Sequence, residues 1–412
     1  MIESAAPDRI AALDLVRGIA VLGILTINIA AFAGGSSAVL SPSLHGPASA
    51  GDTAVFAAGM VLFEGKMRGL FTLLFGASML LFVDRRDAAD DDGALRQVHR
   101  LGWLLLIGYA HHLLLWSGDI LMLYAMLGPI ALALRHLPAK RMVLLAVAFF
   151  MLWHAAFTVI GWSSFTAIEA VHNGSADPVT RATVLAQADA IAAEAHNEVA
   201  ILRQPYLTML AERFTDSLTL PFLVTLLSLG ETVPLMLLGM AMYRTGFFTG
   251  GWPRAWLWRL AQASLAIGLP LALVQAWWGW SRGFPPEAMF DLLIGPAGPQ
   301  HLALTLAWAA ILVMSAPSLL QTWLGDRLRA AGRMALSNYL LTSLVMAFCF
   351  FGWGLGLAGQ VHAARQWWFV LLAWAIMLAW SKPWLDRFRQ GPVEWLWRSL
   401  TEGRRLPFAR PL

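Results

Sequence analysis

The stretch LFEGKMRGLFTLLFG, Leu62–Gly76, places Glu64, Lys66 and Arg68 in the middle of a long apolar segment. Charged side chains are costly inside a bilayer, so they usually face a partner, a cavity or a transport path. Glu64 and Arg68 are four residues apart and can pair on one helix face. Lys66 points away from both and needs a separate anionic partner, which is either protein or ligand.

The apolar segment around this stretch runs over residues 53–83 and is expected to cross the membrane once. A straight helix of that length would measure about 46 Å, whereas the hydrocarbon core of a bilayer is roughly 30 Å thick. The segment must therefore tilt, protrude or break. Gly65 and Gly69 are the expected breaking points, because glycine tolerates backbone conformations that end a helix.

The whole chain has the composition of an α-helical membrane protein. Of its 412 residues, 58% are hydrophobic and 13% are charged, whereas about a quarter of the residues in a soluble domain are charged. The ten-residue alternation that a membrane barrel needs does not recur. We predict an all-α, polytopic fold with about ten transmembrane helices, over residues 15–33, 53–83, 99–117, 119–134, 142–163, 218–242, 256–280, 300–316, 335–353 and 366–381.

The distribution of basic residues predicts the orientation of these helices. With the N-terminus inside, 21 Lys and Arg residues lie in or beside the inner loops and five lie in the outer loops. Basic residues accumulate in cytoplasmic loops, so both termini are expected in the cytoplasm. The same rule accounts for the formal net charge of +4 without a nucleic-acid partner.

Two polar regions interrupt the single membrane domain that we expect over residues 1–412. Residues 164–217 form an expected extracytoplasmic insertion, in which apolar residues recur at helical spacing from Val184 to Leu202. Pro205 would end that helix, and we expect the helix to lie over the outer mouth of the protein as a cap. Residues 382–412 form an expected basic cytoplasmic tail.

Motifs for metals and common cofactors are missing from the sequence. Cys349 is the single cysteine, which excludes an intrachain disulfide and a cysteine metal cage. His111 and His112 are neighbours on a helix and point about 100° apart, so they do not form a metal pair. The GLGLAG run at Gly354–Gly359 lacks the preceding strand and following helix of a dinucleotide site. We expect no metal and no tightly bound cofactor.

The first span carries its own polar groups. Asp14 and Arg17 are three residues apart, so they share a helix face and are expected to pair near the cytoplasmic end, with Asn28 three turns further along. A signal peptide that ends at Ala33 is an alternative, but a discarded segment has no need of these polar groups.

Other polar residues fall in the middle or outer half of the membrane by residue counting. Glu64, His111 and Glu231 lie at a similar depth, and Asp119 begins the fourth predicted span, where it could also act as a helix cap. This placement is consistent with one shared polar site.

Several stretches, in this order, resemble the YeiB-like family of bacterial inner-membrane proteins: RIAALDLVRGIAVLGILTINIAAF, FEGKMRGLFTLLFGASM, GYAHHLLLWSGDILMLYAMLG, LMLLGMAMYRTGF, GRMALSNYLLTSLV and FRQGPVEWLWRSL. The resemblance covers nearly the whole chain and implies a multi-pass protein of the bacterial inner membrane.

The opening LDLVRGIAVLGILTIN is also similar to a wider group of membrane acyltransferases that includes the heparan glucosaminide acetyltransferase. Asp14, Arg17, Gly18 and Asn28 match the first-helix pattern of that group. The similarity implies transfer of an acyl group from cytoplasmic acyl-CoA to a sugar on the far side, with an intramembrane histidine. His45 follows the first span but lies in a loop that is displaced from the position of the histidine in that group. We therefore assign the role of the intramembrane histidine to His111, which lies in the YeiB-like pattern G-x-x-H…GDIL.

An acyltransferase is therefore the first functional hypothesis. His111 would take the proton of an acceptor hydroxyl, and Asp119 or Glu64 would orient the imidazole. Fixed cations would meet the phosphates of the acyl-CoA donor, which predicts a cavity open to the cytoplasm near Arg17 and Arg68. The expected substrate-binding residues are Asp14, Arg17, Asn28, Lys66, Arg68, Glu231 and Asn338.

Two alternatives use the same residues differently. In a transporter of a small polar or anionic solute, the buried charges would form the solute and proton path. In a membrane scaffold without chemistry, they would only join helices.

Overall fold

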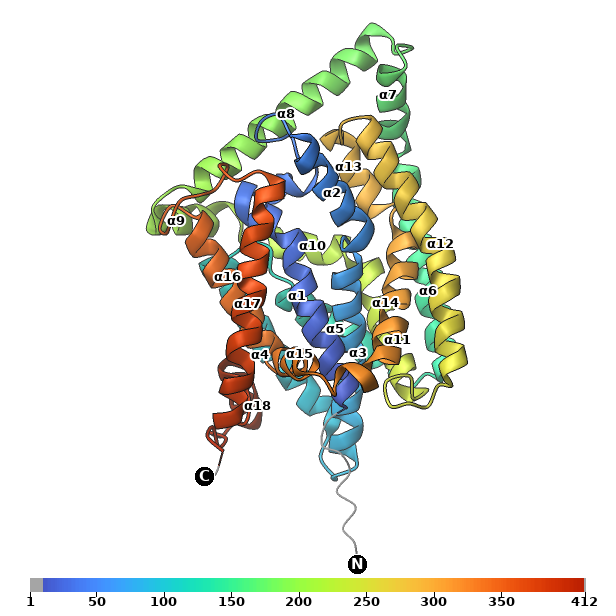
Figure 1. Ribbon diagram of the computed structural model, residues 1–412, viewed down its shortest axis with the longest axis vertical. Helices are drawn as coiled ribbons and strands as arrows, with labels where there is room; N and C mark the ends of the chain where they lie inside the picture. The colour runs from blue at the N-terminus through green and yellow to red at the C-terminus, as the bar shows by residue number, and fades with distance from the viewer. Residues whose placement is uncertain (1–9, 411–412) are drawn as a thin grey trace, which may run out of the picture.

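The computed structural model describes residues 10–410, except for the side chain of Asp216. Residues 1–9 of the predicted N-terminal loop and residues 411–412 of the predicted tail lie outside the described residues. The described chain folds into helices, as predicted (Figure 1): α1 Ala11–Gly34, η1 Ser36–Val39, α2 Ala50–Leu62, α3 Lys66–Asp87, α4 Gly93–Leu114, α5 Leu121–Ala133, α6 Ala139–Ile160, α7 Trp162–His172, α8 Pro178–Leu202, α9 Tyr206–Asp216, α10 Leu220–Leu227, α11 Leu229–Arg244, α12 Arg254–Ser281, α13 Pro286–Ile294, α14 Gly298–Leu319, α15 Trp323–Arg333, α16 Ala335–Phe350, α17 Ala363–Arg387 and α18 Pro392–Glu402.

Six helical segments of the described chain are long and apolar enough to cross a membrane: α1, α2 with α3, α6, α12, α14 and α17. Two bent pairs, α10–α11 at 62° and α15–α16 at 86°, raise the number within residues 10–410 to eight. Seven of these coincide with predicted spans; of the α15–α16 pair only α16 does, because α15 precedes the span predicted over residues 335–353. The two further predicted spans correspond to α4, whose apolar stretch is interrupted by arginine and histidine, and to α5, which at 13 residues is only about 20 Å long.

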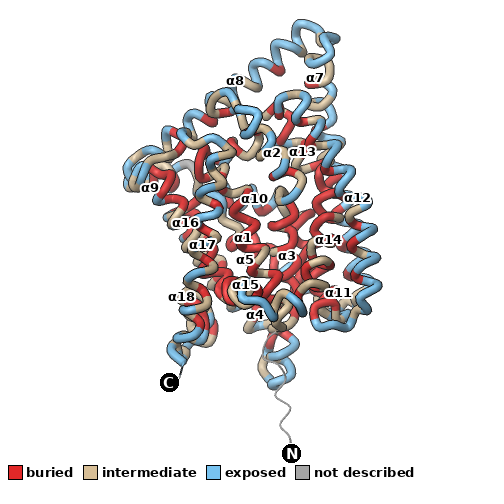
Figure 2. The backbone as a smooth tube through the Cα atoms, in the orientation of Figure 1, coloured by how far each residue is buried: buried red, intermediate tan, exposed pale blue. Residues whose placement is uncertain are grey.

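Glycines let the central helices approach until backbones touch. A Cβ atom on Gly18 of α1 would lie 2.0 Å from the carbonyl oxygen of Leu328 in α15, and one on Gly332 would lie 1.8 Å from that of Asp14. Small residues allow such close approach in membrane helix pairs. Figure 2 shows that α1 and α3 are largely buried, whereas α8 and the outer side of α12 are exposed.

The predicted break in the second span lies at Gly65. This residue has φ +73°, and it separates α2 from α3. A Cβ atom there would lie 2.4 Å from the ring of His301, so both the backbone conformation and the packing require glycine. The break turns Lys66 back along α2, where its Nζ donates to the carbonyl oxygen of Met60.

The region over residues 164–217 contains the predicted helix. α8 ends at Leu202, Pro205 follows, and Val184, Ala195 and Val199 face inward. α8 crosses one end of the molecule (Figure 1), where Glu198 binds Ser36 and the backbone N–H of Ser37 at 2.9 Å. This contact ties the long helix to the loop after α1.

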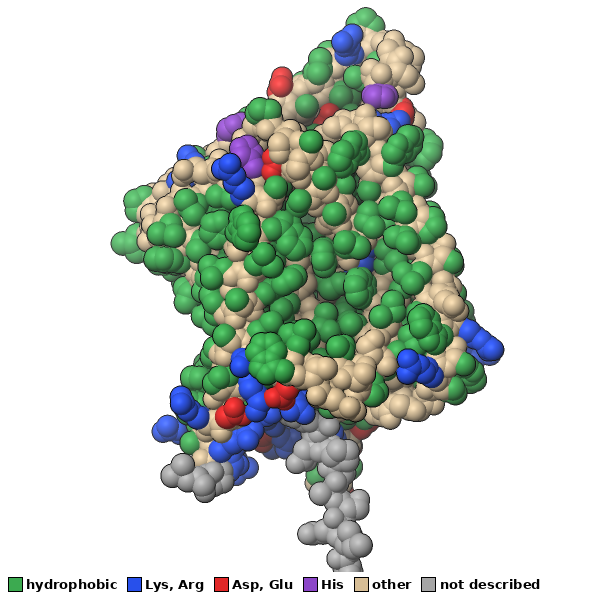
Figure 3. Space-filling model, in the orientation of Figure 1, with side chains coloured by type: hydrophobic (Ala, Val, Ile, Leu, Met, Phe, Trp, Pro, Cys, Tyr) green, Lys and Arg blue, Asp and Glu red, His purple; other side chains and the backbone are tan. Residues whose placement is uncertain are grey.

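Both described chain ends lie at the opposite end of the molecule (Figure 1), which we call the lower end; α8 crosses the upper end. Figure 3 shows Lys and Arg side chains concentrated at the lower end of one face, with hydrophobic side chains over its middle. The region predicted as a tail is ordered, because α17 continues to Arg387 and α18 folds back against α4 and α16.

Candidate functional site

His111 and Asp119 form a buried pair. His111 lies in the last turn of α4, and Asp119 lies in the loop before α5. The imidazole Nδ1 is 2.8 Å from Asp119 Oδ1, and the two side chains are 2% and 1% exposed. Asp119 Oδ2 also accepts the N–H of Met122 at 2.7 Å, so the carboxylate is fixed by the first turn of α5.

This pairing leaves one imidazole nitrogen available for chemistry. Because the carboxylate can only accept a hydrogen bond, Nδ1 of His111 carries the proton and Nε2 presents a lone pair. Nε2 is buried and has no hydrogen-bond partner among the described residues. Of the two carboxylates predicted to orient the imidazole, Asp119 is the one that contacts it, and the imidazole is buried inside the protein.

Tyr339 of α16 lies beside the pair. Its ring centroid is 5.2 Å from that of His111, and its hydroxyl accepts the N–H of Ile120 at 3.3 Å and faces the carbonyl oxygen of Gly118 at 3.4 Å. Tyr339 thus holds the α4–α5 loop against α16 and forms one wall of the cavity below.

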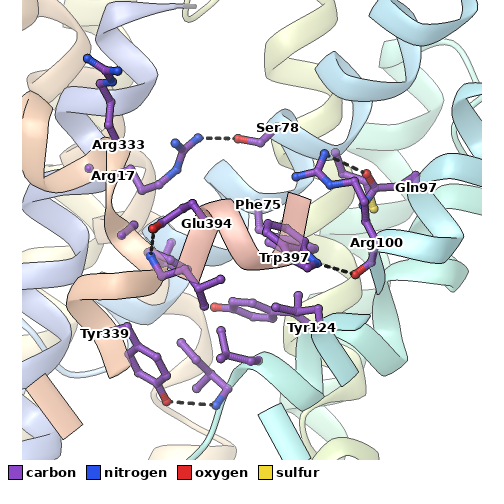
Figure 4. A pocket seen from close by; sticks show the side chains of 18 residues that line it. Arg17, Phe75, Ser78, Gln97, Arg100, Tyr124, Arg333, Tyr339, Glu394 and Trp397 are labelled. Carbon is purple, nitrogen blue, oxygen red and sulfur yellow. Dashed lines mark hydrogen bonds between the residues drawn. The ribbon is translucent and has the colours of Figure 1, made fainter. Parts of the chain in front are cut away.

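A cavity of about 180 Å³ leads from this point towards the lower end (Figure 4). We call it the lower cavity. Its upper wall consists of Ile120, Leu121, Tyr124 and Tyr339, and its sides are mainly aromatic and aliphatic. The side chain of His111 does not line it, but Tyr339 contacts both, so the His111–Asp119 pair lies one side chain away from the cavity.

The lower cavity opens into a second hollow of about 260 Å³, which we call the vestibule. Both share Arg17, Ser78, Arg100, Arg333, Glu394 and Trp397. The charged side chains that line the vestibule are Arg17, Arg85, Arg86, Arg100, Arg333 and Arg398, together with Asp14, Glu394 and Glu402. Six guanidinium groups against three carboxylates leave an excess of positive charge, which favours an anionic ligand.

The vestibule arginines are held in place by neighbouring side chains. The predicted pair forms, with Arg17 Nη1 at 2.9 Å from Asp14 Oδ1, and Arg17 Nη2 also donates to Ser78 Oγ at 2.6 Å. Arg100 lies between two rings, with its guanidinium carbon 4.0 Å from the centroid of Phe82 and 4.4 Å from that of Trp397. These arginines are positioned before any ligand arrives.

Helix α18 closes one side of the vestibule, which the tail assignment did not predict. Glu394 accepts the backbone N–H groups of Leu336 at 2.8 Å and Ser337 at 3.0 Å, where the start of α16 favours a negative charge. Burial raises the pKa of Glu394, and hydrogen bonds from Ser337 oppose that shift. Trp397 donates to the carbonyl oxygen of Arg100 at 2.8 Å. The run FRQGPVEWLWRSL could have indicated that this segment packs against the protein, because it is richer in tryptophan than a basic tail in water requires.

The expected pairing of Glu64 with Arg68 is wrong. Arg68 Nη2 instead lies 2.9 Å from Glu231 Oε2 on α11, because the break at Gly65 removes Glu64 from the helix that carries Arg68. The separate partner that Lys66 needs is the carbonyl oxygen of Met60, which carries the partial negative charge of a helix C-terminus.

Glu64 lines a different hollow, near the upper end, of about 80 Å³. We call it the upper cavity; Thr26, His45 and Trp367 also line it. Lys66 and Arg68 interact electrostatically with Glu64. Further along α3, Thr72 Oγ1 lies 2.8 Å from the hydroxyl of Tyr124, which lines the lower cavity.

The remaining predicted residues lie outside both cavities. Asn28 is half-buried on α1. The amide of Asn338 is engaged in packing, since it donates to Ala331 at 3.0 Å and Ser381 at 3.1 Å and accepts from Trp380 at 2.8 Å. Arg68 does not reach the lower cavity, so the predicted opening is lined by Arg17 without Arg68. Within residues 10–410, no group of three or more His, Cys, Asp or Glu side chains is placed to hold a metal ion.

Comparison with known proteins gives relatives over the full length. Residues 242–404 match the family described as "Protein of unknown function (DUF418)". The chain is 30% identical over 405 residues to "Uncharacterized protein YeiB" of Escherichia coli K12, covering 96% of each chain. It is 29% identical over 412 residues to "Uncharacterized protein YxaH" of Bacillus subtilis 168, covering 96% of this chain and 94% of the relative. No solved structure matches the chain.

Proposed function

This multi-pass membrane protein belongs to the YeiB family, and we propose that it is an acyltransferase of the bacterial inner membrane. It would move an acyl group from cytoplasmic acyl-CoA to a hydroxylated, sugar-type acceptor on the other side. One observation carries this proposal: the lower cavity shares its lining with an arginine-rich vestibule, and Tyr339 alone separates it from the buried His111–Asp119 pair.

The proposed orientation places the lower end in the cytoplasm. The basic side chains that gather there agree with the bias of Lys and Arg towards inner loops (Figure 3), and both termini would lie on that side. In this arrangement α4 and α5 cross the membrane inside the bundle, which brings the number of spans to about ten.

The cavity suits the two parts of a thioester donor. Guanidinium groups bind phosphate through paired, charge-assisted hydrogen bonds, and the vestibule offers Arg17 and Arg100 in fixed positions. The apolar walls of the lower cavity, including Phe71 and Phe75, suit the uncharged arm and acyl chain. The thioester would then lie near Tyr339, whose movement would join Nε2 of His111 to the cavity.

The His111–Asp119 pair supplies the proton transfers. Nε2 accepts the proton of the acceptor hydroxyl while its oxygen attacks the thioester carbonyl, and Asp119 stabilises the imidazolium that forms. The carbon–sulfur bond breaks, and the departing thiolate takes the proton from His111. The products are an ester and free CoA thiol, and the enzyme returns to its starting protonation state.

Thermal unfolding with CoA and short acyl-CoAs tests the donor site. Ligand at a hundred times its dissociation constant stabilises the folded state by about 2.7 kcal/mol. Arg17→Gln should weaken this effect, whereas Arg254→Gln, an exposed arginine of the lower end outside the vestibule, should not. His111→Ala and Asp119→Asn should retain donor binding and lose transfer. The proposal is rejected if no thioester stabilises the folded protein, or if His111→Ala still transfers.

A transporter of a small polar or anionic solute is the second candidate. The observation in its favour is a series of polar groups that starts at Glu64 in the upper cavity, just before α3, and continues along α3 through Arg68–Glu231 to Thr72–Tyr124 at the lower cavity. Helices broken beside buried charges, such as α10–α11, are common in transporters. Solute uptake into vesicles that Arg68→Ala abolishes would favour this function.

A further inference from the structure

A third hollow lies at the lower end, between α15 and the last turns of α17. It measures about 150 Å³, and its charged walls are Arg329, Arg333, Lys382 and Arg410 with Asp326 and Asp386. The proposed acyl transfer makes no use of this hollow. We call it the α15–α17 hollow.

The charges around the α15–α17 hollow do not cancel. Arg329 lies 2.6 Å from Asp326, and Lys382 lies 2.6 Å from Asp386 and 3.7 Å from Asp326. Asp326 and Asp386 are thus paired with Arg329 and Lys382, and Arg333 donates to the carbonyl oxygen of Arg389 at 3.3 Å. The side chain of Arg410 forms no hydrogen bond or ion pair with any residue from 10 to 410. The surplus positive charge indicates that the hollow accepts an anion.

The outward side of α17 carries exposed apolar side chains, which begin about 15 Å along the helix axis from Lys382 of the α15–α17 hollow. On α17, Trp368 is 72% exposed and Leu371 and Leu372 are 46% and 48% exposed. Their spacing of three to four residues continues through the helix to Lys382, so all of them lie on one side of α17. Figure 3 shows a hydrophobic middle with charged side chains below it at the lower end. An apolar stripe that leads down to a cationic hollow matches an acyl chain that lies above a charged headgroup at the lower end.

The bent helix α15 adds an interfacial anchor. It lies at 86° to α16, and its Trp323 is 70% exposed. The guanidinium of Arg327 lies 4.5 Å from the centroid of that indole ring. Tryptophan beside arginine is typical of the boundary between hydrocarbon and headgroups, so the α15–α17 hollow lies at headgroup depth.

We propose that the α15–α17 hollow binds the phosphate of an anionic phospholipid, whose acyl chains lie along the exposed side of α17. Basic pockets between membrane helices bind such headgroups, and the surplus charge selects against zwitterionic lipids. Arg333 borders the hollow, the vestibule and the lower cavity, so bound lipid would also steady the wall of the lower cavity. The proposal does not depend on the acyltransferase function.

Lipid binding to the full-length, delipidated chain in neutral detergent tests the proposal. Phosphatidylglycerol and phosphatidylcholine with the same acyl chains would be compared by thermal unfolding and by native mass spectrometry of retained lipid. We expect phosphatidylglycerol to bind more tightly. Each basic residue near a lipid surface contributes about fivefold in affinity, so Arg410→Gln should lower affinity about fivefold and Lys382→Gln/Arg410→Gln roughly 25-fold.

Two control variants make the result decisive. Lys382→Arg keeps the charge and should bind like the wild type. Arg254→Gln removes an exposed arginine of the lower end, near the exposed Trp256, and should also leave binding unchanged. Arg410→Gln breaks no ion pair, so it carries the test even if the double variant does not fold.

Any of three results would overturn the proposal. The first is equal binding of the two lipids, and the second is unchanged phosphatidylglycerol binding in Arg410→Gln. The third is equal protection by glycerol 3-phosphate or inorganic phosphate at the same concentration, which would show that a soluble anion fills the α15–α17 hollow.

Discussion

Replacing Gly239 by alanine should separate α3 from α11. A Cβ atom on Gly239 would lie 1.8 Å from the carbonyl oxygen of Leu73, and one on Gly76 would lie 2.1 Å from that of Met236. Both obstacles are backbone atoms, which cannot rotate away. Carbon and oxygen need more than 3 Å, so the helices would move apart by roughly 1–2 Å. Overpacking of this kind costs about 1–3 kcal/mol.

The matched control is Gly102→Ala on α4. Gly102 has no atom within 4 Å of its added Cβ, so alanine should be neutral or stabilise the helix by up to about 1 kcal/mol. Thermal unfolding in detergent, followed by the fluorescence of the 20 tryptophans, would rank the variants. We expect Gly239→Ala to unfold at the lowest temperature, then Gly76→Ala, then Gly102→Ala. If Gly239→Ala were as stable as Gly102→Ala, the close contact of the two backbones would be refuted.

Three further variants test single contacts. Arg68→Ala should cost about 1–3 kcal/mol, because it leaves the largely buried Glu231 without its ion-pair partner while the 35% exposure of the Arg68 side chain limits the loss, and a double-mutant cycle should show that the combined variant loses less than the two single losses together. Arg282 holds the pKa of Glu169 below its ordinary value. The ionised pair therefore stabilises the fold by about 0.2–1 kcal/mol at neutral pH. The difference in melting temperature between the wild type and Glu169→Gln should vanish as the pH falls through that lowered pKa. Asp52 accepts the backbone N–H of Ser49 at the start of α2 and that of Ala364 at the start of α17, so Asp52→Ala should cost about 2 kcal/mol in thermal unfolding, and a loss well below that of a single helix cap would contradict this double role.

The spans could be predicted because apolar length is a local property of the sequence. α1, α6, α12, α14 and α17 coincide with predicted segments. The bends between α10 and α11 and between α15 and α16 could not be read in this way. Apolar sequence continues through the bend between α10 and α11, whereas α15 is rich in charged residues and the predicted span began only with α16, at residue 335.

The site shows the same division between local and distant contacts. His111 and Asp119 are eight residues apart, so a short loop brings them together and their pairing could be inferred. Arg68 and Glu231 are 163 residues apart, and counting along one helix assigned Arg68 to the wrong carboxylate. Trp397 was not predicted as a site residue, because its segment was interpreted from its charge as a basic cytoplasmic tail.

The position of the His111–Asp119 pair along α4 separates the routes of the two proposed substrates. Arg100 and His111 are eleven residues apart on this helix, which is about 16 Å along its axis and roughly half of the hydrocarbon core. A donor held by the vestibule therefore needs an extended arm to reach the pair.

Helix α9 covers the upper side of the His111–Asp119 pair. Tyr206 donates to the carbonyl oxygen of Leu114 at 2.9 Å, and Arg213 donates to that of Leu113 at 3.4 Å. An acceptor from the upper side would have to pass beneath these contacts, because the proposed donor would fill the lower cavity. The segment that the sequence marked as a cap would then control which acceptor reaches His111, and the vestibule would control the donor alone.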